Sequence, residues 1–251
     1  MSSVISSHSP DAVRQAVSVL NAGGLVGLPT ETVYGLAARA DIDDAVASIF
    51  LAKGRPTGHP LILHISDISE LDRYAVDVPP AALTLARHCW PGPLTLLLHK
   101  SNAVSHLVTG GRETVAIRIP ANNCARQIIE QCGFALAAPS ANLFGHVSPT
   151  TAQHVLNDLG DRVDLIVDEI IEYYILQTRK LRKNSGFGLG RRRTLRVGAT
   201  TSGLYPPLES LESRNDSKKK FLHLLLLMQR WANGLGCAPG AFFFADELAP
   251  A

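Results

Sequence analysis

The chain has 251 residues, a mass of 27.0 kDa, 46% apolar residues and a mean hydropathy of +0.10, which suits one α/β domain with an appended segment and excludes general disorder. No apolar run is long enough to span a bilayer, and the N-terminus lacks the basic and apolar regions of a secretion signal, so we expect a cytoplasmic protein without a membrane span. The formal charge of +2 is unevenly divided, because residues 1–168 carry 11 Lys and Arg against 15 Asp and Glu, whereas residues 169–251 carry 13 against 7.

The first half of the chain alternates helix and strand signals. Ser9-Pro10 is typical of a helix start, and Gly23-Gly24 of a helix end. A polar loop at residues 29–35 precedes a second helix, which we expect Asp41 to cap. The other elements predicted here are a strand at 25–28, a strand at 61–65 after a Gly- and Pro-rich loop, a helix at 79–88 and a strand at 94–98.

The second half continues the pattern as far as residue 168. Val115, Ile117 and Ile119 alternate with Ala116 and Arg118, which predicts a half-buried strand with Arg118 on the other face. The remaining predictions are a helix at 124–131, a strand at 134–138, a helix at 150–159 that Ser148-Pro149 begins, and a strand at 164–167. Together they predict a single α/β domain in which helices flank a twisted mixed sheet.

The segment from 169 to 251 lacks these regular patterns. Residues 221–231 could form an isolated helix, and residues 241–244 an exposed apolar patch. Its net charge of +6 suits nucleic-acid binding, but it equally suits a poorly folded extension. The four cysteines, which include Cys237, form no Cys-x-x-Cys pair and no zinc-finger spacing with histidine, so we assign no metal site.

A cation-rich loop precedes the predicted strand at 61–65. Lys53 and Arg55 lie two residues apart, and His59 and His64 follow closely. Phosphate or carboxylate ligands need several converging donors, and arginine supplies a planar fork that lysine lacks. An anion site and a solvated turn both stay open as interpretations.

Two polar clusters follow predicted strands, where open α/β sheets bind ligands. Ser140 and Asn142 come after the strand at 134–138, and the absence of Gly-x-Ser-x-Gly around Ser140 favours hydrogen bonding over covalent catalysis, with a capped turn as the alternative. The other cluster consists of Thr30, Glu31, Thr32 and Tyr34, at the exit of the strand at 25–28. Glu31 could act as a base or orient a substrate amine, although a lone carboxylate is more often structural.

Sequence motifs for nucleotide binding are missing. There is no Gly-x-x-x-x-Gly-Lys-Ser/Thr loop, and Gly186, Gly188 and Gly190 do not fit Gly-x-Gly-x-x-Gly. A nucleotide would therefore bind without a Walker loop.

Six sequence blocks nevertheless occur in order between residues 23 and 150. They are Gly23-Gly-Leu-Val-Gly-Leu-Pro-Thr-Glu-Thr-Val-Tyr-Gly-Leu36, Ala52-Lys-Gly-Arg-Pro56, His59-Pro-Leu-Ile-Leu-His64, Trp90-Pro-Gly-Pro-Leu-Thr95, Thr114-Val-Ala-Ile-Arg-Ile-Pro120, and Ala138-Pro-Ser-Ala-Asn142 with Ser148-Pro-Thr150. Together they resemble the YrdC-like family, the threonylcarbamoyl-AMP synthases that begin threonylcarbamoyl-adenosine modification of tRNA. The resemblance implies a YrdC-like catalytic domain at residues 9–168.

The resemblance also implies a reaction. L-threonine and bicarbonate would form a carbamate, which attacks the α-phosphate of ATP and releases pyrophosphate without an enzyme nucleophile. ATP is then a substrate, with Mg²⁺ expected to accompany its triphosphate. The labile product would pass to a downstream tRNA-modifying threonylcarbamoyl transferase complex, and tRNA or double-stranded RNA is a further candidate partner.

The resemblance assigns roles by position. Thr32, His64 and Arg118 match residues that contact threonine. The positions that match ATP contacts are Arg55, His59, Thr114, Ser140 and Ser148, although relatives often carry Asn where this chain has His59. The residues expected to position the reactants and stabilise charge are Lys53, Arg55, Ser140 and Asn142.

The resemblance fails after residue 168. Relatives continue with a Gly-Gly turn and a Glu-Ser-Thr strand, whereas this chain has Glu169-Ile-Ile-Glu-Tyr-Tyr and only a remnant of a later block, in which Arg196 is a candidate ATP ligand. We hypothesise that residues 169 to about 194 are frameshifted or alternatively spliced, and we expect residues 169–251 to be partly disordered. Two alternatives to a synthase are a non-catalytic RNA-binding module of this family and an inactive truncated variant.

Overall fold

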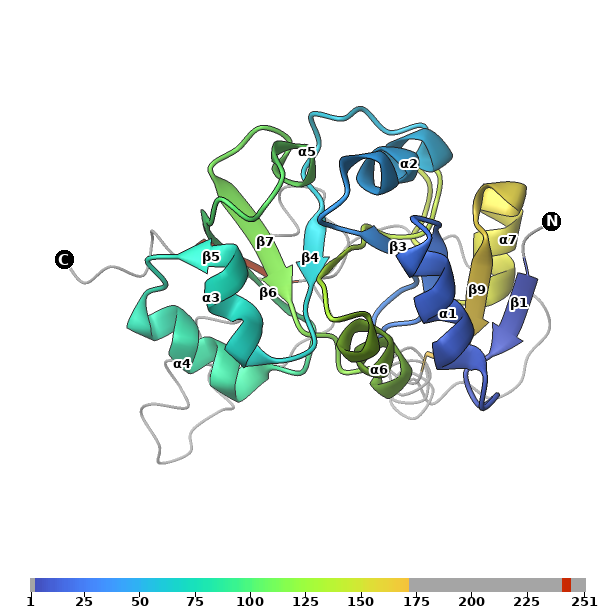
Figure 1. The fold of residues 1–251 in the computed structure, drawn as a ribbon, viewed down its shortest axis with the longest axis horizontal. Coiled ribbons are helices and arrows are strands. Elements are labelled where there is room, and N and C mark those ends of the chain that lie inside the picture. The colour runs from blue at the N-terminus through green and yellow to red at the C-terminus, as the bar shows by residue number, and fades with distance from the viewer. Residues whose placement is uncertain (1–2, 172–240, 245–251) are drawn as a thin grey trace, which may run out of the picture.

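The computed structural model of the chain describes residues 3–171 and 241–244. In these residues ten strands form one mixed sheet, and helices pack against it (Figure 1). This arrangement confirms the predicted α/β fold class. Cys237, the candidate ATP ligand Arg196 and the helix expected at residues 221–231 lie outside the described residues.

The sheet joins segments that are far apart in the chain. Its strands are β1 (Ser3–Ser6), β2 (Val26–Leu28), β3 (Gly35–Arg39), β4 (Ile62–His64), β5 (Ala75–Val76), β6 (Leu94–Lys100), β7 (Thr114–Arg118), β8 (Leu136–Ala137), β9 (Leu165–Asp168) and β10 (Ala241–Phe244). Their order across the sheet is β1-β9-β2-β3-β8-β4-β7-β6-β10, and β5 pairs with β6. The β4–β7 pair, which is parallel, lies inside the sheet and carries His64 opposite Arg118.

The helices bury two apolar clusters. They are α1 (Ala12–Asn21), α2 (Asp43–Lys53), α3 (Leu71–Tyr74), α4 (Pro80–Cys89), α5 (His106–Thr109), α6 (Asn123–Cys132) and α7 (Ala152–Leu159), with short 3-10 turns at Ile68–Glu70 and Gly160–Arg162. Residues of α2, α4, α5 and α7 share one cluster, and residues of α1 and α6 share the other. In the described part of the chain, no helix combines the length and the apolar character that crossing a membrane requires.

Three local predictions were wrong. Asp41 does not cap α2, whose N-cap is Ile42, because its carboxylate pairs with Arg39 at 2.6 Å. Ser148 does not cap α7, since the hydroxyl of Thr151 accepts the N–H of His154 there at 3.2 Å. The strand β7 is buried on both faces rather than half-buried, because Val115 and Ile117 pack in an apolar cluster on one face, while Ala116 and Arg118 are covered on the other.

Several strands were not predicted. No residue pattern indicated β1 or β3, which pair with the distant strands β9 and β8. The segment expected to be an exposed apolar patch forms β10, which is hydrogen-bonded parallel to β6. The hydrogen-bonding capacity of the β6 edge therefore explains a strand that sequence periodicity did not reveal.

Candidate functional site

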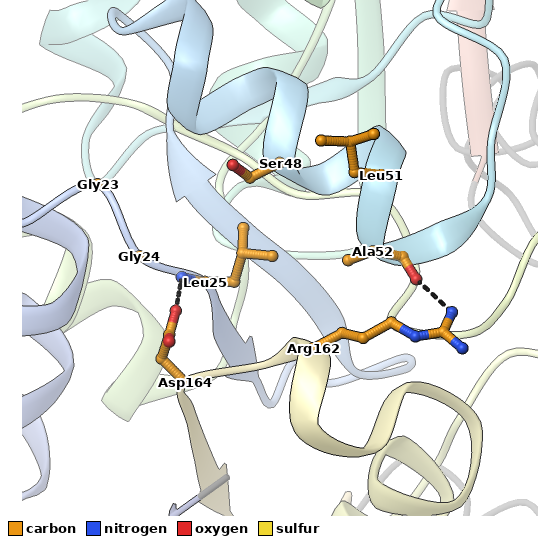
Figure 2. A pocket seen from close by; sticks show the side chains of 8 residues that line it. All are labelled: Gly23, Gly24, Leu25, Ser48, Leu51, Ala52, Arg162 and Asp164. Carbon is orange, nitrogen blue, oxygen red and sulfur yellow. Dashed lines mark hydrogen bonds between the residues drawn. The ribbon is translucent and has the colours of Figure 1, made fainter. Parts of the chain in front are cut away.

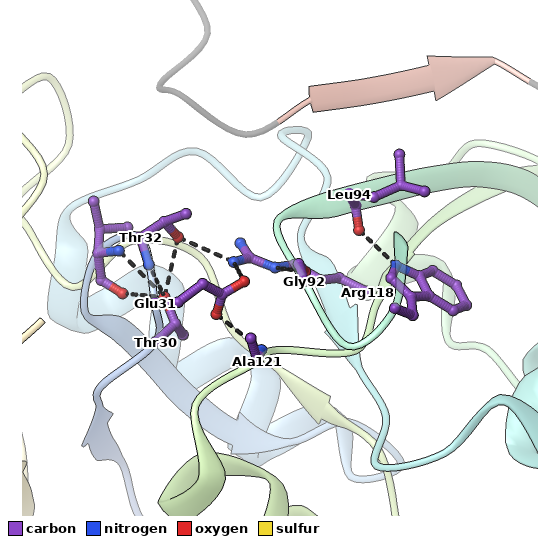
Figure 3. Close-up of polar contacts among 9 residues, drawn as sticks. Thr30, Glu31, Thr32, Gly92, Leu94, Arg118 and Ala121 are labelled. Carbon is purple, nitrogen blue, oxygen red and sulfur yellow. Dashed lines mark hydrogen bonds and ion pairs between the residues drawn. The ribbon is translucent and has the colours of Figure 1, made fainter. Parts of the chain in front are cut away.

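Arg118 lies at the end of β7, and hydrogen bonds fix its buried guanidinium (Figure 3). Its Nε donates to the carbonyl of Gly92 at 3.1 Å, while its Nη2 donates to Oε1 of Glu31 at 2.6 Å and to Oγ1 of Thr32 at 3.1 Å. The side chains of Arg118 and Glu31 are only 7% and 17% exposed, so water screens their attraction weakly. The plane of the guanidinium is therefore held by two segments, the loop of Glu31 and Thr32 and the turn at Gly92.

The turn that offers its carbonyl to Arg118 requires glycine. A Cβ on Gly92 would collide with the main-chain carbonyl of Cys89. The N–H of Gly92 donates to the carbonyl of Ile119 at 2.8 Å, which anchors the turn next to the end of β7. The Trp-Pro-Gly-Pro block thus has a structural role beside the predicted threonine contact.

His64 lies beside Arg118, since the two residues are partners in the β4–β7 ladder. Its imidazole is buried, and its Nδ1 has no hydrogen-bond partner. Burial, followed by the positive charge of Arg118, lowers the pKa of His64 to about 3. The ring is therefore neutral at physiological pH.

We expect His64 to make the fold sensitive to acid. The imidazole of His64 stays neutral in the folded protein down to about pH 3, whereas in the unfolded chain it binds a proton near pH 6.5. As the pH falls from 6.5 toward 3, the free energy of unfolding should therefore decrease by up to about 1.4 kcal/mol per pH unit. Denaturant unfolding at about pH 7 and about pH 5.5 should show a smaller acid loss for His64→Gln than for the wild type. The exposed His8, changed to Gln, is the control, and equal acid losses in wild type and His64→Gln would contradict the prediction.

Lys53 joins the end of α2 to the loop after β8. Its side chain is buried, and its Nζ donates to the main-chain carbonyls of Ser140 and Asn142. Burial, together with the nearby charge of Arg55, lowers the pKa of Lys53 to about 7. The ammonium predicted to face a ligand is thus committed to holding the Ser-x-Asn loop.

The side chain of Asn142 continues this bracing. Its Nδ2 donates to the carbonyls of Leu143 at 2.7 Å and His146 at 2.8 Å, while its buried Oδ1 has no partner. The loop also contacts the polar cluster at residues 30–34, because the N–H of Ala141 donates to the carbonyl of Tyr34 at 2.8 Å. The two clusters after predicted strands are therefore neighbours.

Arg55 follows a glycine that ends α2. Gly54 has a φ of 60°, a left-handed conformation that favours glycine and turns the chain out of the helix. Arg55 Nη2 donates to the carbonyl of Pro60 at 2.9 Å, and its guanidinium lies 5.9 Å from the ring centre of Phe144. The ring of His59 lies 5.2 Å from the same ring, so one exposed aromatic joins the two predicted ATP contacts.

Thr114 and Ser148 lie away from these contacts. Thr114 begins β7 on the same face as Arg118, about 13 Å along the strand. Ser148 is half-buried, and the carbonyl of the next residue, Pro149, accepts the N–H of Tyr34 at 2.9 Å. The structure brings neither side chain into a hydrogen bond with another predicted site residue among those it describes.

Three predicted site residues carry buried polar atoms without a hydrogen-bond partner. In the described chain these atoms are Arg55 Nε, His64 Nδ1 and Asn142 Oδ1, and the other such atoms belong to Ser7, Thr95 and Glu169. Buried polar groups are normally satisfied, so each such atom calls for a partner such as a ligand or water. Their coincidence with three sequence-predicted residues favours a binding site here.

Glu31 and Phe144 were absent from the predicted set of site residues. Glu31 was noted as a lone carboxylate, and its partner Arg118 is 87 positions away, so no local spacing could join them. Phe144 gives a clearer signal in the sequence, because it is a large aromatic residue in a polar loop. In the structure its side chain is 47% exposed. Packing against Arg55 and His59 accounts for its position.

An open pocket of about 380 Å³ lies elsewhere on the domain (Figure 2). Gly23 to Leu25, the end of α2, Arg162 and Asp164 line it, and none is a predicted site residue. Arg162 Nη1 donates to the carbonyl of Ala52 at 3.0 Å, and Asp164 Oδ2 accepts the N–H of Leu25 at 2.7 Å. These charged groups therefore bind the chain itself.

Comparison with known proteins relates this domain to one family. The family profile described as "Telomere recombination", named for Sua5, YciO and YrdC, matches residues 18–175. A threonylcarbamoyl-AMP synthase of Pyrococcus abyssi is 47% identical over 156 residues, covering 62% of this chain and 46% of the relative. One of Bacillus subtilis is 49% identical over 165 residues, covering 65% and 47%. The chain thus spans about half the length of these relatives.

Solved structures give the same relation. The crystal structure of P. abyssi Sua5 complexed with L-threonine is 44% identical, with a TM-score of 0.64, and the match covers 67% of this chain and 50% of that one. Escherichia coli YciO is 28% identical, with a TM-score of 0.60, and the match covers 66% and 84%.

Proposed function

Because this chain belongs to the Sua5, YciO and YrdC family, we propose that it is a nucleotidyltransferase that forms threonylcarbamoyl-AMP and pyrophosphate from L-threonine, bicarbonate and ATP. The observation that carries the proposal is the buried Arg118 beside Thr32 and His64, in a domain 44% identical to a Sua5 structure complexed with L-threonine. We take residues 9–168 as the catalytic domain, although the family profile continues to residue 175.

The threonine end of the site would be formed by Arg118, Thr32 and His64. Arg118 is a fixed guanidinium suited to a carboxylate, and the neutral His64 offers an unpartnered nitrogen without a competing charge. Thr32 is buried, and its hydroxyl accepts a hydrogen bond from Arg118. We assign the α-carboxylate of the amino acid to Arg118.

The nucleotide end would be formed by Arg55, His59 and the Ser-x-Asn loop. Arg55 has an unpartnered Nε, and Lys53 braces the loop that carries Ser140 and Asn142. Thr114 and Ser148 complete the predicted ATP contacts, while Arg196 lies outside the described residues. These groups would position ATP and stabilise charge on its phosphoryl oxygens.

The reaction then balances without a covalent enzyme intermediate. Threonine nitrogen bonds to the carbon of bicarbonate, losing water overall, and a carbamate oxygen attacks the α-phosphorus of ATP. The bond from that phosphorus to the bridging oxygen breaks, and its electrons leave with pyrophosphate. The chain's contribution is orientation of two substrates and exclusion of water.

In the described part of the chain, no group of three or more His, Cys, Asp or Glu side chains could hold a metal ion. These residues therefore do not form a site for a resident magnesium ion. Magnesium brought by the triphosphate belongs to the substrate.

The product would be a mixed anhydride of a carbamate and AMP, which water destroys readily. Its use in tRNA modification therefore requires a threonylcarbamoyl transferase complex close by, in the cytoplasm. The alternative function, a non-catalytic module that binds tRNA or double-stranded RNA, rests on the basic segment after residue 168, most of which lies outside the described residues. No contact among residues 3–171 favours it over catalysis.

Pyrophosphate release tests the proposal. The full chain should release pyrophosphate only when ATP, L-threonine and bicarbonate are all present. Arg55→Ala should lower kcat/KM for ATP by roughly tenfold, the cost of one charge-assisted contact. Arg14→Ala removes an exposed arginine paired with Asp11 and should leave the rate unchanged.

Other outcomes would contradict it. Release that continues without threonine would exclude this reaction. A wild type with no release and no rise in melting temperature on adding ATP and threonine would favour the inactive variant. Salt-dependent RNA binding without any release would favour the RNA-binding module.

A further inference from the structure

We propose that Glu31 is a positioning residue that sets Arg118 and Thr32 for recognition of the amino acid. This inference rests on the proposed function and deepens it. The carboxylate of Glu31 accepts from Arg118 Nη2 at 2.6 Å through Oε1 and from the N–H of Ala121 at 3.0 Å through Oε2 (Figure 3). It thus joins the loop that carries Thr32 to the end of β7 and to the loop after it.

Both carboxylate oxygens are needed for this connection. Arg118 donates on one side of Glu31 and a main-chain N–H donates on the other, so an acid satisfies two donors. Glutamine offers only one acceptor oxygen and would turn an N–H₂ group toward one of those donors. Asparagine or alanine would reach neither. The geometry therefore distinguishes a carboxylate from an amide of the same size.

The hydroxyls of Thr30 and Thr32 hold the loop around Glu31. Thr30 Oγ1 donates its single proton to the carbonyl of Val33 at 2.6 Å and accepts the N–H groups of Thr32 and Val33, each at 3.2 Å. Thr32 Oγ1 lies 3.0 Å from Thr30 Oγ1 and accepts from Arg118 Nη2 at 3.1 Å. The loop is therefore joined to Arg118 through Thr32 as well as through Glu31.

Arg118 presents only donors, which suits the carboxylate of an amino acid. Thr32 Oγ1 accepts one of these donors and Glu31 another, so the two residues together fix the direction in which Arg118 faces a ligand.

Kinetics of Glu31 variants test the positioning role. Glu31→Ala should raise KM for L-threonine by about tenfold, because Arg118 loses the carboxylate that holds it beside the loop of Thr32. The kcat and the KM for ATP should change less than about threefold. Glu31→Gln retains one of the two contacts and should raise KM for threonine by about threefold. Asp41→Ala is the matched control, because Asp41 forms an equally short pair with Arg39 outside the site.

Threonine binding provides a readout that does not depend on turnover. Calorimetric titration of each full-length variant with L-threonine alone should give the same order of affinity loss, with Glu31→Ala losing more than Glu31→Gln. If Glu31→Ala does not fold, the comparison of Glu31→Gln with the wild type carries the test. An active wild type whose threonine KM is unchanged in Glu31→Ala and Glu31→Gln, or whose KM for ATP rises equally, overturns the positioning role alone. A wild type that binds threonine but releases no pyrophosphate contradicts the proposed function, and its titrations still test Glu31. A wild type that does not bind threonine overturns both.

Discussion

Replacing Arg118 with methionine is expected to lower kcat/KM for L-threonine by at least about 100-fold. The change removes the guanidinium at the end of β7, which supplies the hydrogen-bond donors for the carboxylate of threonine. Loss of two charge-assisted hydrogen bonds corresponds to about 3 kcal/mol or more of binding free energy. Arg118→Lys should recover little, because an ammonium cannot reproduce the planar fork that reaches Glu31, Thr32 and Gly92 together. Steady-state rates of pyrophosphate release at varied threonine measure the loss.

The same variant should also be less stable. Methionine fills the space but leaves the carboxylate of Glu31, which is 17% exposed, without its cation. Breaking a buried pair in this way costs about 3 kcal/mol. Denaturant unfolding measures the cost, and Arg14→Met is the control because Arg14 is 76% exposed and its pair with Asp11 is worth less than about 1 kcal/mol. An Arg118→Met protein with normal threonine kinetics would remove Arg118 from the site.

Replacing Lys53 with methionine should collapse the Ser-x-Asn loop. Two buried carbonyls, those of Ser140 and Asn142, lose their donor, and the removal of a desolvated amine offsets part of that cost. We expect a net loss of about 2 kcal/mol in unfolding free energy near pH 7 and a large fall in turnover. Lys100→Met changes a half-buried lysine in β6 and should cost less than about 0.5 kcal/mol.

The pH dependence of the Lys53 variant has a definite sign. The pKa of Lys53 is lowered from 10.5 to about 7 in the folded protein, so between these values the unfolded chain binds more protons than the folded one. Stability of the wild type relative to Lys53→Met should therefore rise with pH from about 7 to about 10, by no more than about 1.4 kcal/mol per pH unit. A difference that shrinks as pH rises would contradict a desolvated Lys53.

Much of the local structure was predictable from residue patterns. The longer helices α1, α2, α4, α6 and α7 follow apolar spacing and start and stop signals between sequence neighbours, and they were predicted to within a few residues. The short helices α3 and α5 were not predicted. The strands β1 and β3 were not, because short strands are fixed by partners that lie elsewhere in the chain. Arg118 was expected on the other face of a half-buried strand, and it is buried because the loop of Glu31 and Thr32 and the turn at Gly92 contact it from elsewhere in the chain.

Residue types alone indicated the chemical groups of the candidate site and the family to which they belong. Contacts between distant segments set how these groups are used: Lys53 donates to two carbonyls, Glu31 pairs with Arg118 from 87 positions away, and Thr32 accepts from Arg118. Residue type fixes which charges and donors a chain carries. Their burial, partners and direction of donation depend on contacts between segments that only folding brings together.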